Sequence, residues 1–193
     1  METNLAYQLD EWPEEIIRGR VVMMAAASMN HNRISGNIHT IFDNYLDGRR
    51  CEPCQDGTAL FLEEGAEEYK PDMMVVCDPD KVKRKGVYGA PDLAVEVLSN
   101  STARNDRGHK KDMYEKHGVR EYWIVDPLRM SLEQYVLENG KFVLRDVYHK
   151  YSASELADMD EKERAAIVTE FKCSLFDDLT ISVERVFRRV VLD

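Results

Sequence analysis

Residues 91–127, PDLAVEVLSNSTARNDRGHKKDMYEKHGVREYWIVDP, decide the fold. The apolar run after Pro91 predicts a buried central strand, and EYWIVDP predicts a second strand that stops at Pro127. Between them, apolar residues recur at helical spacing from Thr102 until Gly118 supplies a stop signal. A strand, a helix and a strand in so short a segment indicate a βαβ crossover, and hence a fold of the α/β class.

The sequence before this segment predicts alternating helices and strands. Glu11 to Ile17, with Pro13 in the first turn, is expected to be a short acidic helix, followed by a strand over RVVMMAA (20–26). Ser28 is expected to cap a helix that runs to about Asp47. The runs TALFLE (58–63) and DMMVVC (72–77) predict short strands.

The sequence after Pro127 predicts a hairpin and two helices. The segments 131–138 and 141–148 flank Asn139-Gly140, a strong two-residue hairpin signal. A polar helix is expected around 160–169 and a short amphipathic one from Val183. We expect a single domain over 1–193, with N-terminal elements in 1–50, a catalytic core in 51–127, and the hairpin and C-terminal helices in 128–193.

Charge is distributed unevenly along the chain. The 193 residues include 26 Lys plus Arg and 36 Asp plus Glu, a net charge of −10 that argues against a protein coated with nucleic acid. The window 81–120 nevertheless contains ten basic and five acidic residues, so it carries +5 and the remaining 153 residues carry −15. Any nucleic-acid contact is therefore expected on one face.

The cysteines and the apolar runs indicate the expected location. Four irregularly spaced cysteines do not form a disulfide framework, and the N-terminus lacks the pattern of a signal peptide. No apolar run approaches the roughly 20 residues that a membrane span needs. We therefore expect a reducing, cytoplasmic compartment and no membrane role.

Two carboxylates stand where the local pattern does not require them. Asp72 opens a strand directly after Pro71, and Glu96 interrupts an apolar strand, on the same face as Asp92. A buried carboxylate must be neutral, paired with a cation or bound to a metal ion. Asp72 and Glu96 together would form the oxygen-only site that Mg²⁺ or Mn²⁺ prefers, with Asp92 as an auxiliary carboxylate.

The predicted helix after this strand adds a cation. Lys110 and Tyr114 lie one turn apart on the stripe expected to face inward, whereas Lys111 lies on the neighbouring, solvent-facing stripe. His31 is expected on the inward side of its own helix. His31 and Tyr114 are therefore candidate auxiliary residues that hold water or relay a proton.

Three blocks of the sequence resemble a known family. PDMMVVCDPD (71–80), the segment 91–114 and GVREYWIVDP (118–127) are similar to the Uma-two family of endonucleases, within the PD-(D/E)XK nuclease superfamily. The resemblance implies an α/β (α+β) fold with a restriction-endonuclease-like core, a mixed sheet flanked by helices. It also implies that this core binds a divalent metal ion, Mg²⁺ or Mn²⁺, through Asp72 and Glu96.

The resemblance departs from the superfamily pattern at one position. The lysine that usually follows the mid-strand acid by two residues is Leu98 here. The family looks like a migrated-lysine variant, in which a helix residue supplies the amine, and Lys110 matches that place. Asp72, Glu96 and Lys110 are the catalytic residues that this resemblance implies.

The implied function is metal-dependent hydrolysis of phosphodiester bonds in DNA. The basic run KVKRK would contact the phosphate backbone through Lys81, Lys83, Arg84 and Lys85. An edge strand of the predicted hairpin would support a homodimer, since nucleases that cut both strands commonly act as two-fold pairs.

Other readings stay open from the residues alone. The protein could be an inactive nuclease-fold module that binds nucleic acid or a protein partner, because Leu98 occupies the usual lysine position. A purely structural or interaction domain is the third class. For individual residues, Glu96 could be an ion-paired structural carboxylate, and Lys110 could be solvated.

Overall fold

A computed structural model describes residues 14–192 of the chain. Its central feature is a six-stranded mixed sheet. The two strands predicted in residues 91–127 are parallel neighbours in this sheet, with Glu121 opposite Leu93. In spatial order the strands are β12 (Lys141–His149), β11 (Ser131–Glu138), β10 (Glu121–Asp126), β9 (Leu93–Val97), β6 (Met73–Val76) and β3 (Glu52–Gln55).

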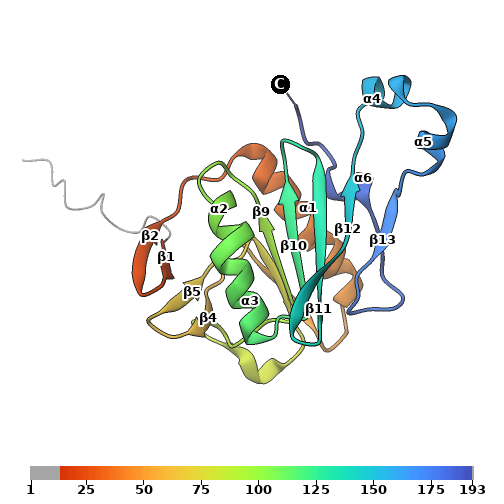
Figure 1. Cartoon of the computed structure of the whole chain (residues 1–193). Helices are drawn as coiled ribbons and strands as arrows, with labels where there is room; N and C mark the ends of the chain where they lie inside the picture. Colours follow the sequence, from red (N-terminus) through yellow and green to blue (C-terminus); the bar gives the residue numbers. More distant parts are fainter. Residues whose placement is uncertain (1–13, 193) are drawn as a thin grey trace, which may run out of the picture.

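Helices cover both faces of this sheet (Figure 1). On one face, α1 (Met29–Leu46) begins after its cap Ser28 and buries apolar side chains against Val95 and Trp123. On the other face lie α2 (Ala103–Asn105), the π-helical turn η3 (Asp106–Lys110) and α3 (Lys111–His117). The crossover from β9 to β10 therefore runs through one helical segment, which ends at Gly118 with φ 82° as its sequence predicts.

A second six-stranded sheet packs on the face that carries α3. Its buried side chains, among them Leu60, Tyr69 and Val87, join those of β9 and α3 in one apolar cluster. In spatial order its strands are β2 (Arg20–Met23), β1 (Glu14–Ile17), β5 (Glu67–Tyr69), β4 (Leu60–Glu63), β8 (Gly86–Tyr88) and β7 (Val82–Lys83), the last following a short 3₁₀ turn, η2 (Pro79–Lys81).

The C-terminal part of the chain returns to the main sheet. The hairpin of β13 (Glu170–Lys172) and β14 (Thr180–Ser182) leads into α6 (Val183–Val186), which contacts α1. Glu121 is fully buried and accepts hydrogen bonds from Trp123, from Gln134 and from the backbone N–H of Ser174. These donors offset the cost of burying the carboxylate and attach the returning segment to β10.

The expected acidic helix from Glu11 to Ile17 is wrong over its described part, which is strand β1. Strand β1 pairs with β2, with Ile17 opposite Arg20. Arg18 and Gly19 therefore form a two-residue turn with φ of 54° and 69°. Such turns normally have Asn or Gly at the first position, because that residue adopts a left-handed conformation. Arg18 is unusual at this position, so the sequence gives no sign of the hairpin.

The C-terminal helices also differ from expectation. The polar helix expected at 160–169 is only α5 (Glu161–Ala165), and the preceding α4 (Ala153–Asp158) was not expected. Each begins with a capping box, which the pairs Ser152/Glu155 and Asp160/Glu163 form. Neither helix buries a residue, so the capping groups rather than core packing define them.

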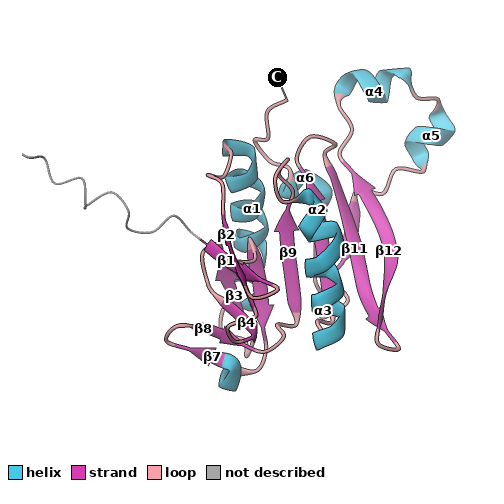
Figure 2. Ribbon diagram, turned by 60° about the vertical axis from the view of Figure 1, so that its left-hand side comes forward, coloured by secondary structure: helices cyan, strands magenta, loops and turns pink. Residues whose placement is uncertain are grey.

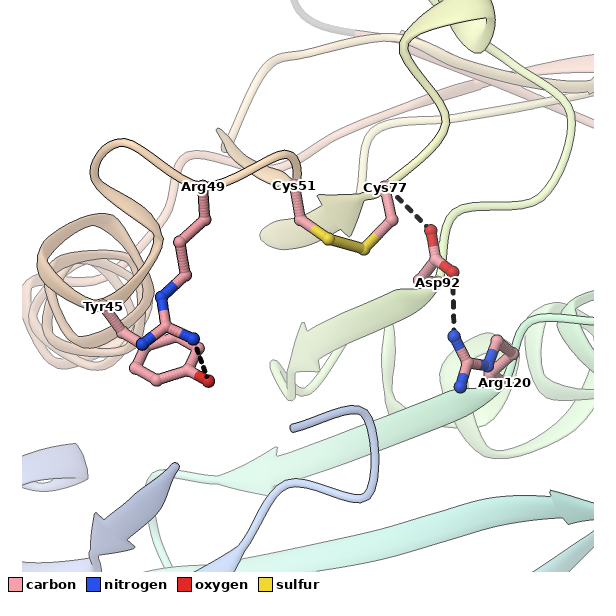
Figure 3. The surroundings of a disulfide bond; sticks show 6 residues. All are labelled: Tyr45, Arg49, Cys51, Cys77, Asp92 and Arg120. Atoms are coloured by element: carbon pink, nitrogen blue, oxygen red, sulfur yellow. Dashed lines mark hydrogen bonds and ion pairs between the residues drawn. A yellow bond between two sulfur atoms is a disulfide. The ribbon is translucent and has the colours of Figure 1, made fainter. Parts of the chain in front are cut away.

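The sequence predicts no disulfide framework, but the structure contains one disulfide bond. Cys51 and Cys77 form a disulfide, because β3 and β6 pair antiparallel with Glu52 opposite Val76, which places the two cysteines side by side (Figure 3). The backbone N–H of Cys77 donates to Asp92, at 2.8 Å. Irregular spacing in the sequence gave no sign of this pair, because the strand register alone brings the two residues together.

No helix among residues 14–192 combines the length and the apolarity that crossing a membrane requires.

Candidate active site

A cavity of about 620 Å³ opens where β9 and β10 end and α1 begins. Figure 2 shows β9 running toward this end of the molecule. The segments 24–28, 99–103 and 126–128 form part of the cavity wall. The carboxyl ends of neighbouring parallel strands are a common place for ligand sites in α/β folds. The titratable side chains that line this cavity include Glu15, His31, Asp72, Glu96 and Lys110.

Asp72 and Glu96 meet because of the strand register. β6 and β9 are antiparallel, with Met73 opposite Val95, so Asp72 lies opposite Glu96 one residue further on. Asp72 Oδ2 accepts a hydrogen bond from the backbone N–H of Val97, at 2.6 Å. Only 6% of Asp72 and 3% of Glu96 are exposed. The two carboxylates are therefore fixed on one face of the sheet at the cavity.

Lys110 reaches the same place from η3. Its Nζ lies 2.8 Å from Oε1 of Glu15, 3.2 Å from Oε1 of Glu96 and 3.7 Å from Oδ1 of Asp106. The residue is 3% exposed. Single π-helical turns inside helices are frequent at functional sites, and this one carries the lysine. The expected inward orientation of Lys110 is thus what the structure shows.

The electrostatics of the cluster follow from its burial. Burial raises the pKa of Glu96 well above its ordinary value, against the effect of Lys110, and Asp106 and Asp72 add to the increase. Burial also raises the pKa of Asp106, to about 6. Although burial alone lowers the pKa of Lys110, the surrounding carboxylates, Glu96 first, raise it well above its ordinary value. The amine therefore stays protonated.

Tyr114 and His31 occupy different positions in the site. The Tyr114 hydroxyl donates to Oε1 of Glu96 at 2.7 Å, but Tyr114 does not line the cavity. Burial raises the pKa of Tyr114 well above its ordinary value, so it remains a neutral donor that orients Glu96. His31 does line the cavity, and its Nε2 lies 3.1 Å from Oδ1 of Asp72.

Asp92 lies away from the cluster. It stands at the opposite end of β9 from the cavity, roughly 13 Å along the strand from Glu96 at the usual rise per residue. Its carboxylate accepts from the backbone N–H of Cys77 and from Arg120 (Figure 3). In this structure Asp92 fixes the start of β9. Its position does not support the expected role as an auxiliary carboxylate beside the metal ligands.

The basic run KVKRK also lies away from the cavity. It spans the end of η2 and the β7–β8 hairpin, and none of its residues lines the cavity. Lys81 Nζ donates to the backbone carbonyl of Ala90 at 2.8 Å. Lys83, Arg84 and Lys85 are exposed. The expected basic window is therefore divided, with Lys110 inside the site and KVKRK on a separate surface.

Lys111, the neighbouring candidate amine, points elsewhere. Its Nζ lies 3.6 Å from the centre of the Tyr135 ring on β11, a cation–π contact between two half-buried side chains. Lys111 does not line the cavity. Helix geometry therefore directs the two adjacent lysines to different places, as their different stripes predict, but Lys111 is half-buried over Tyr135 and not fully in solvent as expected.

The residues present suit a divalent cation of the hard, oxygen-preferring type. Three buried carboxylates, from Glu15, Glu96 and Asp106, surround the Lys110 ammonium, and a fourth, from Asp72, lines the same cavity as Glu15 and Glu96. Asp106 Oδ1 has no hydrogen-bond partner. Within residues 14–192 no group of three or more His, Cys, Asp or Glu side chains is arranged to enclose a metal ion. Mg²⁺ commonly binds one or two carboxylates and keeps several waters, so Asp72 and Glu96 would suffice as protein ligands.

Comparison with known proteins identifies the family. The Uma2 family model, described as "Putative restriction endonuclease", matches residues 2–161. The chain belongs to the Uma2 family. The resemblance that the sequence blocks suggest is therefore confirmed.

This Uma2 chain is also similar to two further relatives and to one solved structure. An uncharacterized protein of Synechocystis is 33% identical over 136 residues, which is 70% of this chain but only 65% of that protein's length. A second one from the same organism is 29% identical over 124 residues, 63% of this chain and 70% of that protein. The crystal structure of a putative nuclease from Anabaena variabilis has a TM-score of 0.67 and 16% identity, and covers 91% of this chain and 90% of that one. That likeness confirms the expected fold class, a mixed α+β fold with a mixed sheet flanked by helices.

Two acidic residues of the cluster around Lys110, Glu15 and Asp106, were not singled out from the sequence. Glu15 lies in the segment that the sequence predicts to be a helix, although the alternating burial of Glu15 and Ile17 is the pattern of a strand. Asp106 lies on η3 one turn before Lys110, and this i,i+4 spacing was the available signal. Both were hidden because their partners come from distant segments.

Proposed function

We propose that this protein is a divalent-metal-dependent endonuclease that hydrolyses phosphodiester bonds in DNA. The observation that carries the proposal is the burial of Lys110 between Glu96 and Glu15 beside Asp72, in an open cavity. A buried ammonium and paired carboxylates in a cleft are typical of a reactive site rather than of an ordinary core. Membership of the Uma2 family supports the same reaction class.

Each residue has a defined role in this proposal. Asp72 and Glu96 would hold Mg²⁺ or Mn²⁺, and such an ion, when bound, lowers the pKa of water and neutralises charge on a phosphate. Lys110 is protonated and cannot accept a proton, so it would act as a donor to the negative charge that develops on the phosphate. Tyr114 holds Glu96 in place from behind, and His31 holds Asp72.

The second candidate is an inactive module of the same fold that binds nucleic acid or a protein partner. The observation in its favour is Leu98, which lines the cavity at the position where a lysine is usual. It differs from the first proposal in one measurable property, because a module of this kind has no need to bind a metal ion. Calorimetric titration with Mn²⁺ in the presence of DNA separates the two.

The test of the leading proposal compares wild type with Glu96→Gln on supercoiled plasmid DNA, with Mg²⁺, Mn²⁺ or EDTA. We expect cleavage by the wild type only with a divalent ion, and a loss of about 10²–10³-fold in the variant, the effect typical of removing one catalytic group. Glu138→Gln, at the exposed tip of β11, is the matched control and should cleave as wild type does. Equal activity of Glu96→Gln and wild type would refute the site.

A further inference from the structure

We infer that Glu15 is the positioning residue of the site, and that it holds the Lys110 ammonium in place from the second sheet. Its kinetic consequence rests on the proposed function, whereas its structural consequence does not. Glu15 does not belong to the central sheet that carries Asp72 and Glu96. It lies on β1 of the second six-stranded sheet. The site is therefore completed by a separate layer of the fold.

The contacts of Glu15 are shorter than those of the other lysine partners. Its Oε1 lies 2.8 Å from Lys110 Nζ, against 3.2 Å for Oε1 of Glu96. The same oxygen accepts from the backbone N–H of Lys70 at 2.9 Å. Glu15 is only 5% exposed. Because a backbone group fixes this carboxylate, it is a rigid acceptor for the amine.

Lys110 needs such an acceptor because its side chain is flexible. A lysine carries its charge on a four-carbon stem with a large rotamer entropy, so an amine without a fixed partner occupies many positions. Glu96 is shared, since its Oε1 also accepts from Tyr114 and the residue is a proposed metal ligand. Glu15 does not accept from Tyr114 and is not a proposed metal ligand, so it can hold Lys110 throughout a reaction.

A second set of contacts joins η3 to β5 and to the turn after β1. His109, the neighbour of Lys110 on η3, lies 2.9 Å from Oε1 of Glu67 through its Nε2. Arg18, in the turn after β1, donates from its backbone N–H to Glu67 and from its side chain to Nδ1 of His109. The β1–β2 hairpin thus holds η3 at two successive residues, and Glu15 is the contact that reaches the amine.

The kinetic test uses Glu15→Ala and Glu15→Gln, with Glu14→Gln as the matched control on the exposed face of the same strand. We expect kcat to fall about 10–100-fold in Glu15→Ala, as is common for residues that orient a catalytic group. KM for DNA and the affinity for Mn²⁺ should stay unchanged, and Glu15→Gln should recover part of kcat because it keeps an acceptor. Equal kcat in all three variants and wild type would overturn the inference.

A double-mutant cycle with Lys110→Met separates positioning from general stability. If Glu15 acts through Lys110, Glu15→Gln should cause no further loss of kcat in the Lys110→Met background. An equal loss in both backgrounds would mean that Glu15 serves the fold and not the amine, and would overturn the inference.

The structural test requires no activity. In protein labelled with ¹⁵N-lysine, an ammonium held by a carboxylate gives a slowly exchanging Nζ signal in NMR spectra. We expect the Lys110 signal to be present in wild type and Glu14→Gln, weakened in Glu15→Gln and lost in Glu15→Ala. If wild type cleaves no DNA, the proposed function fails, but this result still decides the inference: an unchanged Lys110 signal in both Glu15 variants would refute it.

Discussion

The Nζ atom of Lys110 lies 3.2 Å from Oε1 of Glu96, although the two residues belong to opposite sides of a strand–helix connection. The π-helical turn η3 brings this about, because it ends at Lys110 and directs that side chain back over β9. Among residues 14–192, Lys110 is the only buried lysine or arginine, and it comes from a helix, whereas Leu98 occupies the usual position of the lysine on the strand.

Replacing Lys110 should abolish cleavage, whereas replacing its neighbour should not. We expect Lys110→Met to lower kcat about 10²–10³-fold, because it removes the donor to the developing charge. Lys111→Met is the matched control, and loses only a cation–π contact with Tyr135, worth about 0.5–1 kcal/mol of stability. Plasmid cleavage and urea unfolding on the same samples check both, and equal loss of kcat in the two variants would contradict the assignment.

Asp106 should make the metal-free protein less stable as the pH rises through the weakly acidic range. Burial raises its pKa from 3.8 in the unfolded chain to about 6, so between these values the folded state binds more protons. Its contribution to the free energy of unfolding therefore falls as pH rises, by at most about 1.4 kcal/mol per pH unit, and is constant above about pH 6. Relative to wild type, Asp106→Asn should gain stability across this window. Urea unfolding in EDTA at several pH values measures the difference, and parallel curves would contradict it.

The β7–β8 hairpin should contribute to DNA affinity without affecting the chemical step. Replacing Lys83, Arg84 and Lys85 by Gln should reduce the slope of log K against log salt by up to about 2.7, for three phosphate contacts on duplex DNA. Cleavage at saturating DNA should be unchanged, because none of the three lines the cavity. The control replaces Lys162 and Arg164 of α5 by Gln. An unchanged salt slope would remove the hairpin from the interface.

The Cys51–Cys77 disulfide should stabilise the oxidised protein. It closes a loop between residues 26 apart in the chain, for which the chain-entropy model gives about 3.5 kcal/mol. Reductant should lower the thermal midpoint of wild type and leave Cys51→Ser unaffected. Cys54→Ser, a free cysteine on β3, should behave as wild type does. No effect of reductant on wild type would mean that the bond does not form. The expected cytoplasmic location stays a prediction, and thiol labelling in cells would show which state is present.

The homodimer expected from the sequence stays a prediction, and the structure offers a place for it. Strand β12 is an edge of the central sheet, and Val143 and Leu144 on it are 44% and 47% exposed. If two copies pair along this edge, Leu144→Lys should give a monomer, since lysine on an edge strand opposes pairing. Light scattering decides the matter, and a monomeric wild type would refute the expected dimer.

Local patterns in the sequence determined most of the central sheet. A few neighbouring residues are enough to determine the strands β9 and β10, the end of the helix at Gly118 and the Asn139-Gly140 turn. The same local logic singled out Asp72 and Glu96, because a carboxylate on an apolar strand is costly wherever that strand lies. Helix periodicity likewise separated Lys110 from Lys111.

Only the tertiary structure decided what surrounds those residues. Glu15 reaches Lys110 across 95 residues of chain, and Cys51 meets Cys77 through strand register. Asp92 and KVKRK resembled site residues in the sequence but lie outside the cavity, Asp92 at the opposite end of β9 and KVKRK on a separate surface. A sequence pattern reports the preference of a segment for burial and for a periodicity, whereas the partner of a buried charge depends on which distant segments the sheet order and register bring together.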